Sequence, residues 1–274
     1  MFTQVATRTI EEPLRIGSEG LELSGMLHHP SDDGPVRGAV LVCPTDGEER
    51  AWTLRTLVTF ARLAAKRGYW ALRFDYAGQG ESDGAYEQTS VSERIANIGA
   101  ALAALRARSG VAEPAVVATR LGAALALEAA ARDSAVTRMA LWEPVVAIDP
   151  YVTNLVRVNL TSQMVIHKKV VKPTEELLEE LKRGGTVSAN GYQLTSTLLD
   201  GLSMLRPAER LTSFGGNLLV VTGPATRLPE SRAEVSKLTF LPFWKEPKAD
   251  MTPPQAVLTL TADWLDRAAG AGER

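Results

Sequence analysis

The sequence has one cysteine, three histidines and almost no net charge. With Cys43 alone the 274-residue chain has no internal disulfide, which is typical of a reducing compartment and leads us to expect a cytoplasmic protein. A net charge of −2 argues against nucleic-acid binding and against a membrane-surface role, since both need a clustered basic excess. No segment approaches the ~18 uncharged apolar residues of a membrane span. Residues 1–13 lack the apolar stretch of a signal peptide.

Hydrophobic residues make up 45% of the chain, enough for a full core. The continuous apolar run 39–43 is typical of a strand buried on both faces of a parallel sheet. Strand patterns cover 7–16, 20–29, 39–43, 69–75, 115–119, 138–143, 217–222 and 238–241, and helical patterns cover 52–66, 91–108, 121–132 and 253–269. Their alternation predicts an α/β protein with a mostly parallel, doubly wound sheet of about eight strands.

Residues 151–205 differ from this pattern because they are more polar and have helical spacing. Their centre, residues 175–183, is rich in Glu and Lys, and a Gly184-Gly185 break follows it. We predict that this segment is a helical cap inserted into a core made of residues 1–150 and 206–274.

Residues 115–124 read Ala-Val-Val-Ala-Thr-Arg-Leu-Gly-Ala-Ala, a short strand that becomes a helix with no loop between them. This is the pattern of a nucleophile elbow, G-x-S-x-G, in which a strained turn lifts one side chain above the sheet. Ala118 and Gly122 take the two small positions, where strand and helix pass closely. Arg120 stands at the apex, where a hydrolase has serine.

A second turn, residues 75–84, has the pattern D-x-x-G-x-G-x-S that follows the fourth strand of α/β hydrolases. This turn, the elbow and residues 142–145, 190–194 and 242–244 come in the same order as in the exosortase A system-associated hydrolases. Those proteins also have Arg-Leu-Gly at the elbow and an acidic pair after the third strand, here Glu48-Glu49. The sequence thus resembles that family over about residues 20–265, which implies an α/β-hydrolase fold with a cap. Residues 43–47 depart from the family's pattern, so the resemblance does not name a substrate.

A serine hydrolase needs a nucleophile, a histidine and an orienting acid. Arg120 cannot attack a carbonyl, because its guanidinium stays protonated. Residues 243–250 contain no histidine where one is expected, and residues 223–226 contain no carboxylate. His28 and His29 fall on an early strand, whereas His167 falls in the cap, where it either hangs over the pocket or is solvated.

The apex favours an anion, because Arg120 adds a guanidinium to the positive end of a helix. We expect Arg120 to hold a substrate anion or to form an internal salt bridge with Glu48, Glu49 or Glu143. The same carboxylates are candidates for moving a proton. Cys43 is either a nucleophile or a buried strand-end residue.

Further candidates surround the elbow in the predicted fold. Thr45 and Asp46 either belong to the site or cap the helix that follows them. Aromatic residues there form pocket walls or pack in the core. The candidate substrate-binding residues are Thr45, Asp46, Leu121, Trp142, His167, Phe243 and Trp244. We identify no metal ligands and no cofactor motif.

Two functions are compatible with these residues. The first is an enzyme on the hydrolase scaffold that acts without an acyl-enzyme on a small molecule bearing a carboxylate, phosphate or acyl group. The second is an inactive pseudo-hydrolase that serves as a binding or scaffolding module, for example in a biosynthetic assembly. The sequence leaves a homodimer open. Fold alone does not decide between these functions.

Overall fold

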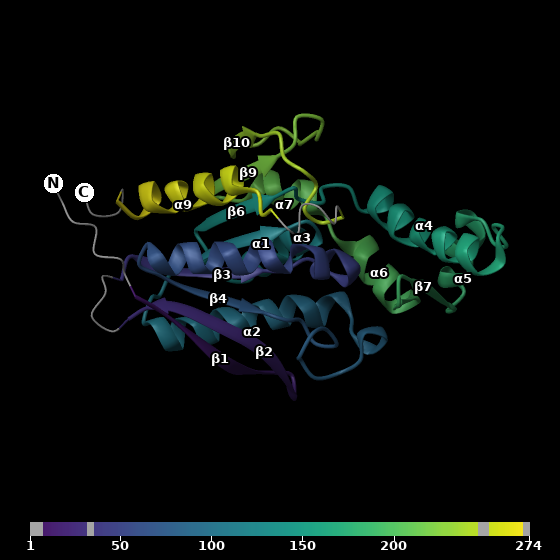
Figure 1. The fold of residues 1–274 in the computed structure, drawn as a ribbon, viewed down its shortest axis with the longest axis horizontal. Helices are drawn as coiled ribbons and strands as arrows, with labels where there is room; N and C mark the ends of the chain where they lie inside the picture. Colours follow the sequence, from purple (N-terminus) through teal and green to yellow (C-terminus); the bar gives the residue numbers. More distant parts are fainter. Residues whose placement is uncertain (1–7, 32–35, 246–251, 271–274) are drawn as a thin grey trace.

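The computed structural model describes residues 8–31, 36–245 and 252–270. Its centre is an eight-stranded sheet in the order β1-β2-β4-β3-β5-β6-β9-β10 (Figure 1). The strands are β1 (Thr9–Ser18), β2 (Leu21–Pro30), β3 (Gly38–Cys43), β4 (Tyr69–Phe74), β5 (Ala115–Thr119), β6 (Arg138–Trp142), β9 (Asn217–Thr222) and β10 (Glu234–Lys237). Strand β2 is antiparallel to β1 and β4, and the other neighbours are parallel. The predicted mostly parallel sheet is confirmed.

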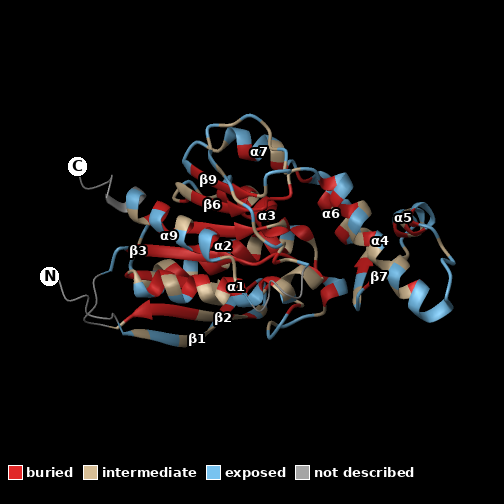
Figure 2. Ribbon diagram, turned by 45° about the horizontal axis from the view of Figure 1, so that its top comes forward, coloured by how far each residue is buried: buried red, intermediate tan, exposed pale blue. Residues whose placement is uncertain are grey.

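Helices cover both faces of this sheet, as expected for a doubly wound topology. Residues of α1 (Gly47–Lys66) and α9 (Gln255–Gly270) share one apolar cluster with Val40 and Val42 of β3. Residues of α2 (Val91–Ser109) and α3 (Leu121–Ala130) share the other cluster with Leu41 and Cys43. Strand β3 is buried along its whole length, which is why its sequence is continuously apolar (Figure 2).

Between β6 and β9 the chain forms α4 (Ile148–His167), α5 (Thr174–Lys182), β7 (Thr186–Ala189), β8 (Tyr192–Thr195), α6 (Ser196–Met204) and α7 (Pro207–Ser213). All of these except α7 lie beyond one end of the sheet, whereas α7 lies against α3 (Figure 1). The prediction of helix alone was incomplete, because β7 and β8 form an antiparallel hairpin. Asn190 and Gly191 join them with φ of 49° and 90°, the two positive values of the Asn-Gly turn that tight hairpins favour.

Several predicted boundaries were wrong for local reasons. Helix α4 begins at Ile148, three residues before the predicted helical segment 151–205, because the proline at position 150 is tolerated in the first turn of a helix. Residues 238–241 are not a strand. The last strand is β10, whose residues are mostly exposed and polar, so that it lacks an apolar signal. None of the helices in the described ranges is long and apolar enough to cross a membrane.

The loop after β3 crosses the start of α3 at Gly122. A Cβ atom at Gly122 would overlap the carbonyl oxygen of Pro44, so that only glycine fits this crossing. The close approach confirms the small residue that the elbow pattern requires here. It also fixes how residues 44–49 lie over the turn between β5 and α3.

We expect Gly122→Ala to lower the free energy of unfolding by about 1–3 kcal/mol, because the loop backbone has to move. Gly99→Ala is the matched control: Gly99 is also helical, it is exposed, and nothing lies within 4 Å of its added Cβ. That variant should stabilise the protein by about 0.5–1 kcal/mol through helix propensity. Urea unfolding of both variants measures the difference, and equal effects would contradict a tight crossing.

Candidate active site

Arg120 is the single residue between β5 and α3. Its backbone has φ of 52° and ψ of −126°, a conformation that is unfavourable for a residue with a side chain. Two contacts hold it there: its N–H donates to the Trp142 carbonyl at 3.0 Å, and its own carbonyl accepts from the N–H of Val145 at 3.3 Å. The first N–H groups of α3 have no partner within the helix, so the turn presents both donors and a cation.

The guanidinium of Arg120 is paired with the carboxylate of Glu49. Its Nε and Nη2 lie 3.1 and 3.0 Å from Oε1 of Glu49, and its Nη1 donates to the Glu143 carbonyl at 3.3 Å. The guanidinium carbon also lies 4.8 Å from the centre of the Trp244 ring, within range of a cation–π contact. Both partners of the ion pair are about one-fifth exposed, so the pair forms part of an accessible surface.

The two residues of the acidic pair after β3 have different partners, because the side chains of successive helical residues point about 100° apart. Glu49 turns toward Arg120, and its Oε2 accepts from the Thr45 hydroxyl at 3.0 Å. Glu48 turns toward the β7–β8 hairpin, and its carboxylate accepts from the side-chain amide of Asn190 at 2.6 Å. Of the three carboxylates considered for Arg120, the structure therefore selects Glu49.

The carboxylate of Glu143 does not reach Arg120, which corrects that expectation. It accepts hydrogen bonds from the Gly223 N–H and from the Thr226 hydroxyl, the latter at 3.0 Å. The side chain is buried at this position. Glu143 thus holds the loop after β9 with its side chain and contacts Arg120 only through its backbone carbonyl.

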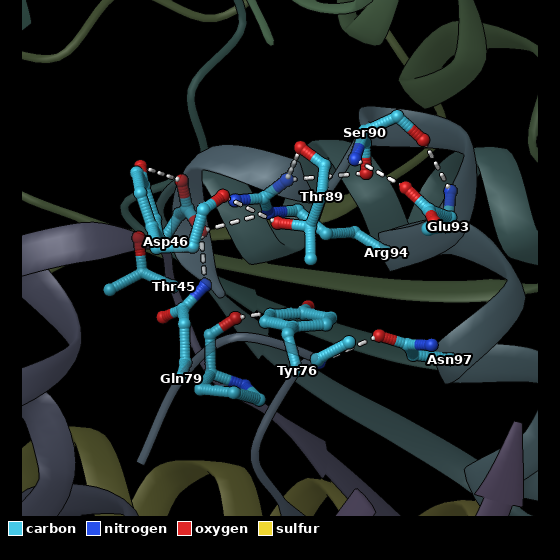
Figure 3. Close-up of polar contacts among 12 residues, drawn as sticks. Thr45, Asp46, Tyr76, Gln79, Thr89, Ser90, Glu93, Arg94 and Asn97 are labelled. Atoms are coloured by element: carbon cyan, nitrogen blue, oxygen red, sulfur yellow. Dashed lines mark hydrogen bonds and ion pairs between the residues drawn. The ribbon is translucent and has the colours of Figure 1, made fainter. Parts of the chain in front are cut away.

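Asp46 anchors the loop beneath the site (Figure 3). Its carboxylate accepts from Nε of Arg94 at 3.0 Å and from the Tyr86 hydroxyl at 2.9 Å, and also from the side-chain amide of Gln79. Arg94 in turn donates to the Thr89 carbonyl at 3.0 Å. Asp46 takes the N-cap position of α1 by its backbone, but its side chain makes no capping bond. The alternative that the Asp46 side chain caps α1 is therefore wrong, because this side chain forms a buried ion pair with Arg94.

Arg120 and Glu49 line a pocket of about 460 Å³ under α4. Its polar end is formed around Arg120 and Glu49, and its apolar wall comes from the first half of α4. The lining residues are Asp46, Glu48, Glu49, Arg120, Val145, Ala147, Tyr151, Asn154, Leu155, Val158, Trp244 and Lys245. A larger surface cavity of about 820 Å³ lies between α2, α3, α6 and α7 and does not include Arg120. We assign the site to the smaller pocket because the charged groups converge there.

Four sequence candidates are core residues rather than pocket walls. Cys43 is fully buried, and burial raises the pKa of its thiol well above the usual range, so it is a poor nucleophile. Leu121 and Phe243 are buried in the two apolar clusters. Trp142 packs edge-on against Phe60, and its indole N–H donates to the Thr261 hydroxyl at 2.9 Å. Of the three aromatic candidates, Trp244 lines the pocket.

The three histidines lie away from Arg120. His29 is on β2, stacked on Trp70 at 4.3 Å, and its ring bonds to the Pro30 carbonyl. His28 is buried on the same strand and accepts from Nε of Arg73 at 3.1 Å. His167 is the last residue of α4; it is exposed to solvent and does not line the pocket. In the part of the chain that the structure describes, no histidine ring bonds to a hydroxyl or thiol.

Three residues in and beneath the site were not predicted from the sequence: Tyr151, Lys245 and Arg94. Burial raises the pKa of Tyr151 well above its usual value, and the charge of Glu49 adds to this, so its phenol is a neutral donor beside the pocket. The burial of Arg94 could have been predicted from its spacing. Together with Val91, Ile95 and Ile98 it follows the i, i+3, i+4 and i+7 pattern, which places its cation on the buried face of α2. Such a cation requires a buried anion.

No cluster of three or more His, Cys, Asp or Glu side chains suited to a metal ion occurs among residues 8–31, 36–245 and 252–270. Around the Arg120–Glu49 pair the pocket has the phenol of Tyr151, the ammonium of Lys245 and the ring of Trp244, together with the polar residues Asp46, Glu48 and Asn154.

An eight-stranded sheet of this order, with a strained residue between β5 and α3 and a pocket above it, defines an α/β-hydrolase fold. Residues 34–196 match the model of the serine aminopeptidase family S33 of α/β hydrolases, and the chain belongs to this family. A comparison with curated proteins gave no match.

Solved structures agree on the fold at low sequence identity. Est1E from Butyrivibrio proteoclasticus with bound ferulic acid is 15% identical, with 91% of this chain and 98% of that chain covered and a TM-score of 0.62. The proline iminopeptidase of Mycobacterium smegmatis is 15% identical, with 95% and 100% covered and a TM-score of 0.60. A proline iminopeptidase-related protein of Thermus thermophilus is 21% identical, with 95% and 98% covered and a TM-score of 0.59.

Removing Arg94 should leave the Asp46 carboxylate charged and buried without its partner. We expect Arg94→Met to lower the free energy of unfolding by about 3–5 kcal/mol. Lys182→Met, which breaks the exposed pair of Lys182 with Glu179, is the matched control and should cost less than about 0.5 kcal/mol. Adding Asp46→Asn to Arg94→Met should recover part of the loss. Urea unfolding tests all three, and a small effect of Arg94→Met would rule out a structural role for the pair.

His28 should make stability depend on pH. Burial, with the neighbouring charge of Arg73, lowers the pKa of His28 from 6.5 to about 4, so the unfolded chain binds a proton between these values and the folded chain does not. Stability is therefore complete above about pH 6.5 and falls as the pH drops toward 4, by a total on the order of 3 kcal/mol. We expect His28→Gln to flatten this part of the curve and His167→Gln to leave it unchanged. A wild-type slope in the His28 variant would assign the dependence to other groups.

Proposed function

We propose that the protein is a hydrolase-fold enzyme without a Ser-His-Asp triad, which acts on an anionic small molecule held by Arg120. The observation that carries the proposal is a guanidinium on the strained turn between β5 and α3, where members of this fold carry their nucleophile. The pairing of this group with a semi-exposed carboxylate in a pocket adds support. The likeness to the exosortase A system-associated hydrolases fits this proposal, because they share Arg-Leu-Gly at this turn.

The chemistry of the pocket suits an anion with an apolar body. Arg120, Lys245 and the start of α3 favour a carboxylate or phosphate at one end, whereas Leu155, Val158 and the face of Trp244 suit an apolar group. The carboxylate of Glu49 is already bound to the guanidinium of Arg120, so a substrate carboxylate would share that guanidinium or displace Glu49 from it.

Glu49 is the group placed to move a proton. We propose that a water molecule forms a bond to the acyl carbon while its proton passes to the Glu49 carboxylate. The negative charge that develops on the acyl oxygen is stabilised by Arg120 and the N–H groups at the start of α3. The bond from the acyl carbon to the leaving oxygen then breaks, and that oxygen receives the proton from Glu49. No covalent intermediate forms, which is consistent with the buried thiol of Cys43 and the distant histidines.

The single buried cysteine supports a reducing, cytoplasmic location for this reaction.

Two esters of matched size test the role of Arg120: the mono-4-nitrophenyl ester of succinic acid, which carries a carboxylate, and 4-nitrophenyl butyrate, which does not. We expect kcat/KM to be higher for the charged ester, and Arg120→Ala to remove that preference with a loss of about 100-fold. Arg120→Lys should recover little, because a lysine offers no bidentate fork. Arg132→Ala, at an exposed arginine of the larger cavity, is the control and should change neither value.

Glu49→Gln separates proton transfer from binding, because glutamine keeps one accepting oxygen for the Arg120 guanidinium but cannot take a proton. We expect kcat to fall and KM for the charged ester to change little. Stoichiometric labelling of a serine by a fluorophosphonate would contradict the proposal. A second result would also contradict it: benzoate raises the melting temperature of the wild type but not of Arg120→Ala, and neither ester is hydrolysed. That is the behaviour of a binding module.

A further inference from the structure

The end of α4 and the loop after it expose an unusual cluster of apolar side chains. Five of the eleven exposed large apolar residues in the described part of the chain fall within eight positions. We call residues 164–172 the tip; its apolar members are Met164, Val165, Ile166, Val170 and Val171, each between 46% and 70% exposed. The other six are distributed along the chain, and scattered apolar residues of that kind need no explanation, whereas a contiguous patch does.

The tip is built to keep these side chains outward. Gln163 is buried, and its Oε1 accepts from the N–H groups of Val171 and Lys172 at 2.6 and 2.8 Å. Its Nε2 donates to the Lys172 carbonyl at 2.9 Å. Lys168 turns the chain with φ of 59° directly after α4. The returning loop is thus tied to α4 by a polar group, and its two valines lie in solvent instead of folding inward.

The charge of the tip is positive although the chain as a whole is slightly acidic. Residues 164–172 contain three lysines and no carboxylate. Lys172 is paired with Glu180 at 2.6 Å, whereas Lys168 and Lys169 form no ion pair with any residue that the structure describes. A local patch of this kind is not visible in the net charge, which is why composition argued against a membrane-surface role.

We propose that the tip docks onto an anionic lipid surface, with its apolar side chains in the interface and Lys168 and Lys169 among the headgroups. Segments that combine exposed apolar residues with flanking lysines bind such surfaces through area and charge together. The tip lies at the extremity of the molecule away from the sheet, where it can meet a flat surface (Figure 2).

A second copy of the chain fits the tip less well. A two-fold contact places the same patch against itself, so that the lysines of one copy would face those of the other. An anionic surface meets them with the opposite charge. The proposal rests on the tip alone and not on the chemistry assigned to Arg120.

Cosedimentation of the full chain with vesicles tests the proposal. We expect binding to vesicles of phosphatidylglycerol and phosphatidylcholine in equal parts, with weaker binding to phosphatidylcholine alone and in high salt. Val165→Asp and Ile166→Asp should each weaken binding about tenfold, because each removes an exposed apolar side chain that the lipid interface would bury. Lys168→Gln and Lys169→Gln should each weaken it about fivefold.

Met204→Asp is the matched control, because Met204 is 77% exposed on α6 and lies outside the tip. We expect it to bind as the wild type does, and all variants to keep the wild-type melting temperature, since the changed side chains are exposed. Absence of vesicle binding would overturn the proposal, as would equal binding to neutral vesicles. A concentration-dependent dimer in sedimentation that Ile166→Asp abolishes would overturn it too, and would assign the tip to a second copy.

Discussion

The contact between the Asp46 carboxylate and the Arg94 guanidinium determines where the charged groups of the site lie. Both side chains are buried, so the ion pair has little freedom to rearrange in water. It fixes the residue at which α1 begins, and the register of α1 sets which way Glu48 and Glu49 point. The crossing of Pro44 over Gly122 fixes the same loop from the other side. The Asp46–Arg94 pair and the crossing at Gly122 therefore position the Arg120–Glu49 pair, and neither contributes to the apolar wall of the pocket.

This arrangement separates two kinds of ion pair in one small region. The Asp46 and Arg94 side chains are almost fully buried, whereas those of Arg120 and Glu49 remain partly exposed in the pocket. A partly exposed pair has a smaller desolvation cost and exchanges partners more readily. This difference in burial is the physical basis for our proposal that Arg120, and not Arg94, binds an anion.

The sequence predicted the sheet and the turn at Arg120 because both depend on local patterns. Apolar runs such as 39–43 identify buried strands, and a strand that becomes a helix without a loop identifies the elbow. The partner of Arg120 depended on the register of α1, which begins five residues before the predicted start. The sequence left open whether Trp142 and Phe243 form pocket walls or pack in the core, because it does not show which face of a strand end or loop is covered. The Asn190-Gly191 hairpin was readable and was overlooked.

Helix α4 contributes residues to both the pocket and the tip. Its first turns supply Tyr151, Asn154 and Leu155 to the pocket wall, and its last turn carries the tip. Its 20 residues form one rod about 30 Å long, in which a tilt of about 10° at one end displaces the other by about 5 Å. The helix therefore connects the tip to the pocket wall, so a change of its tilt at the tip would shift Tyr151 and Leu155 relative to Glu49.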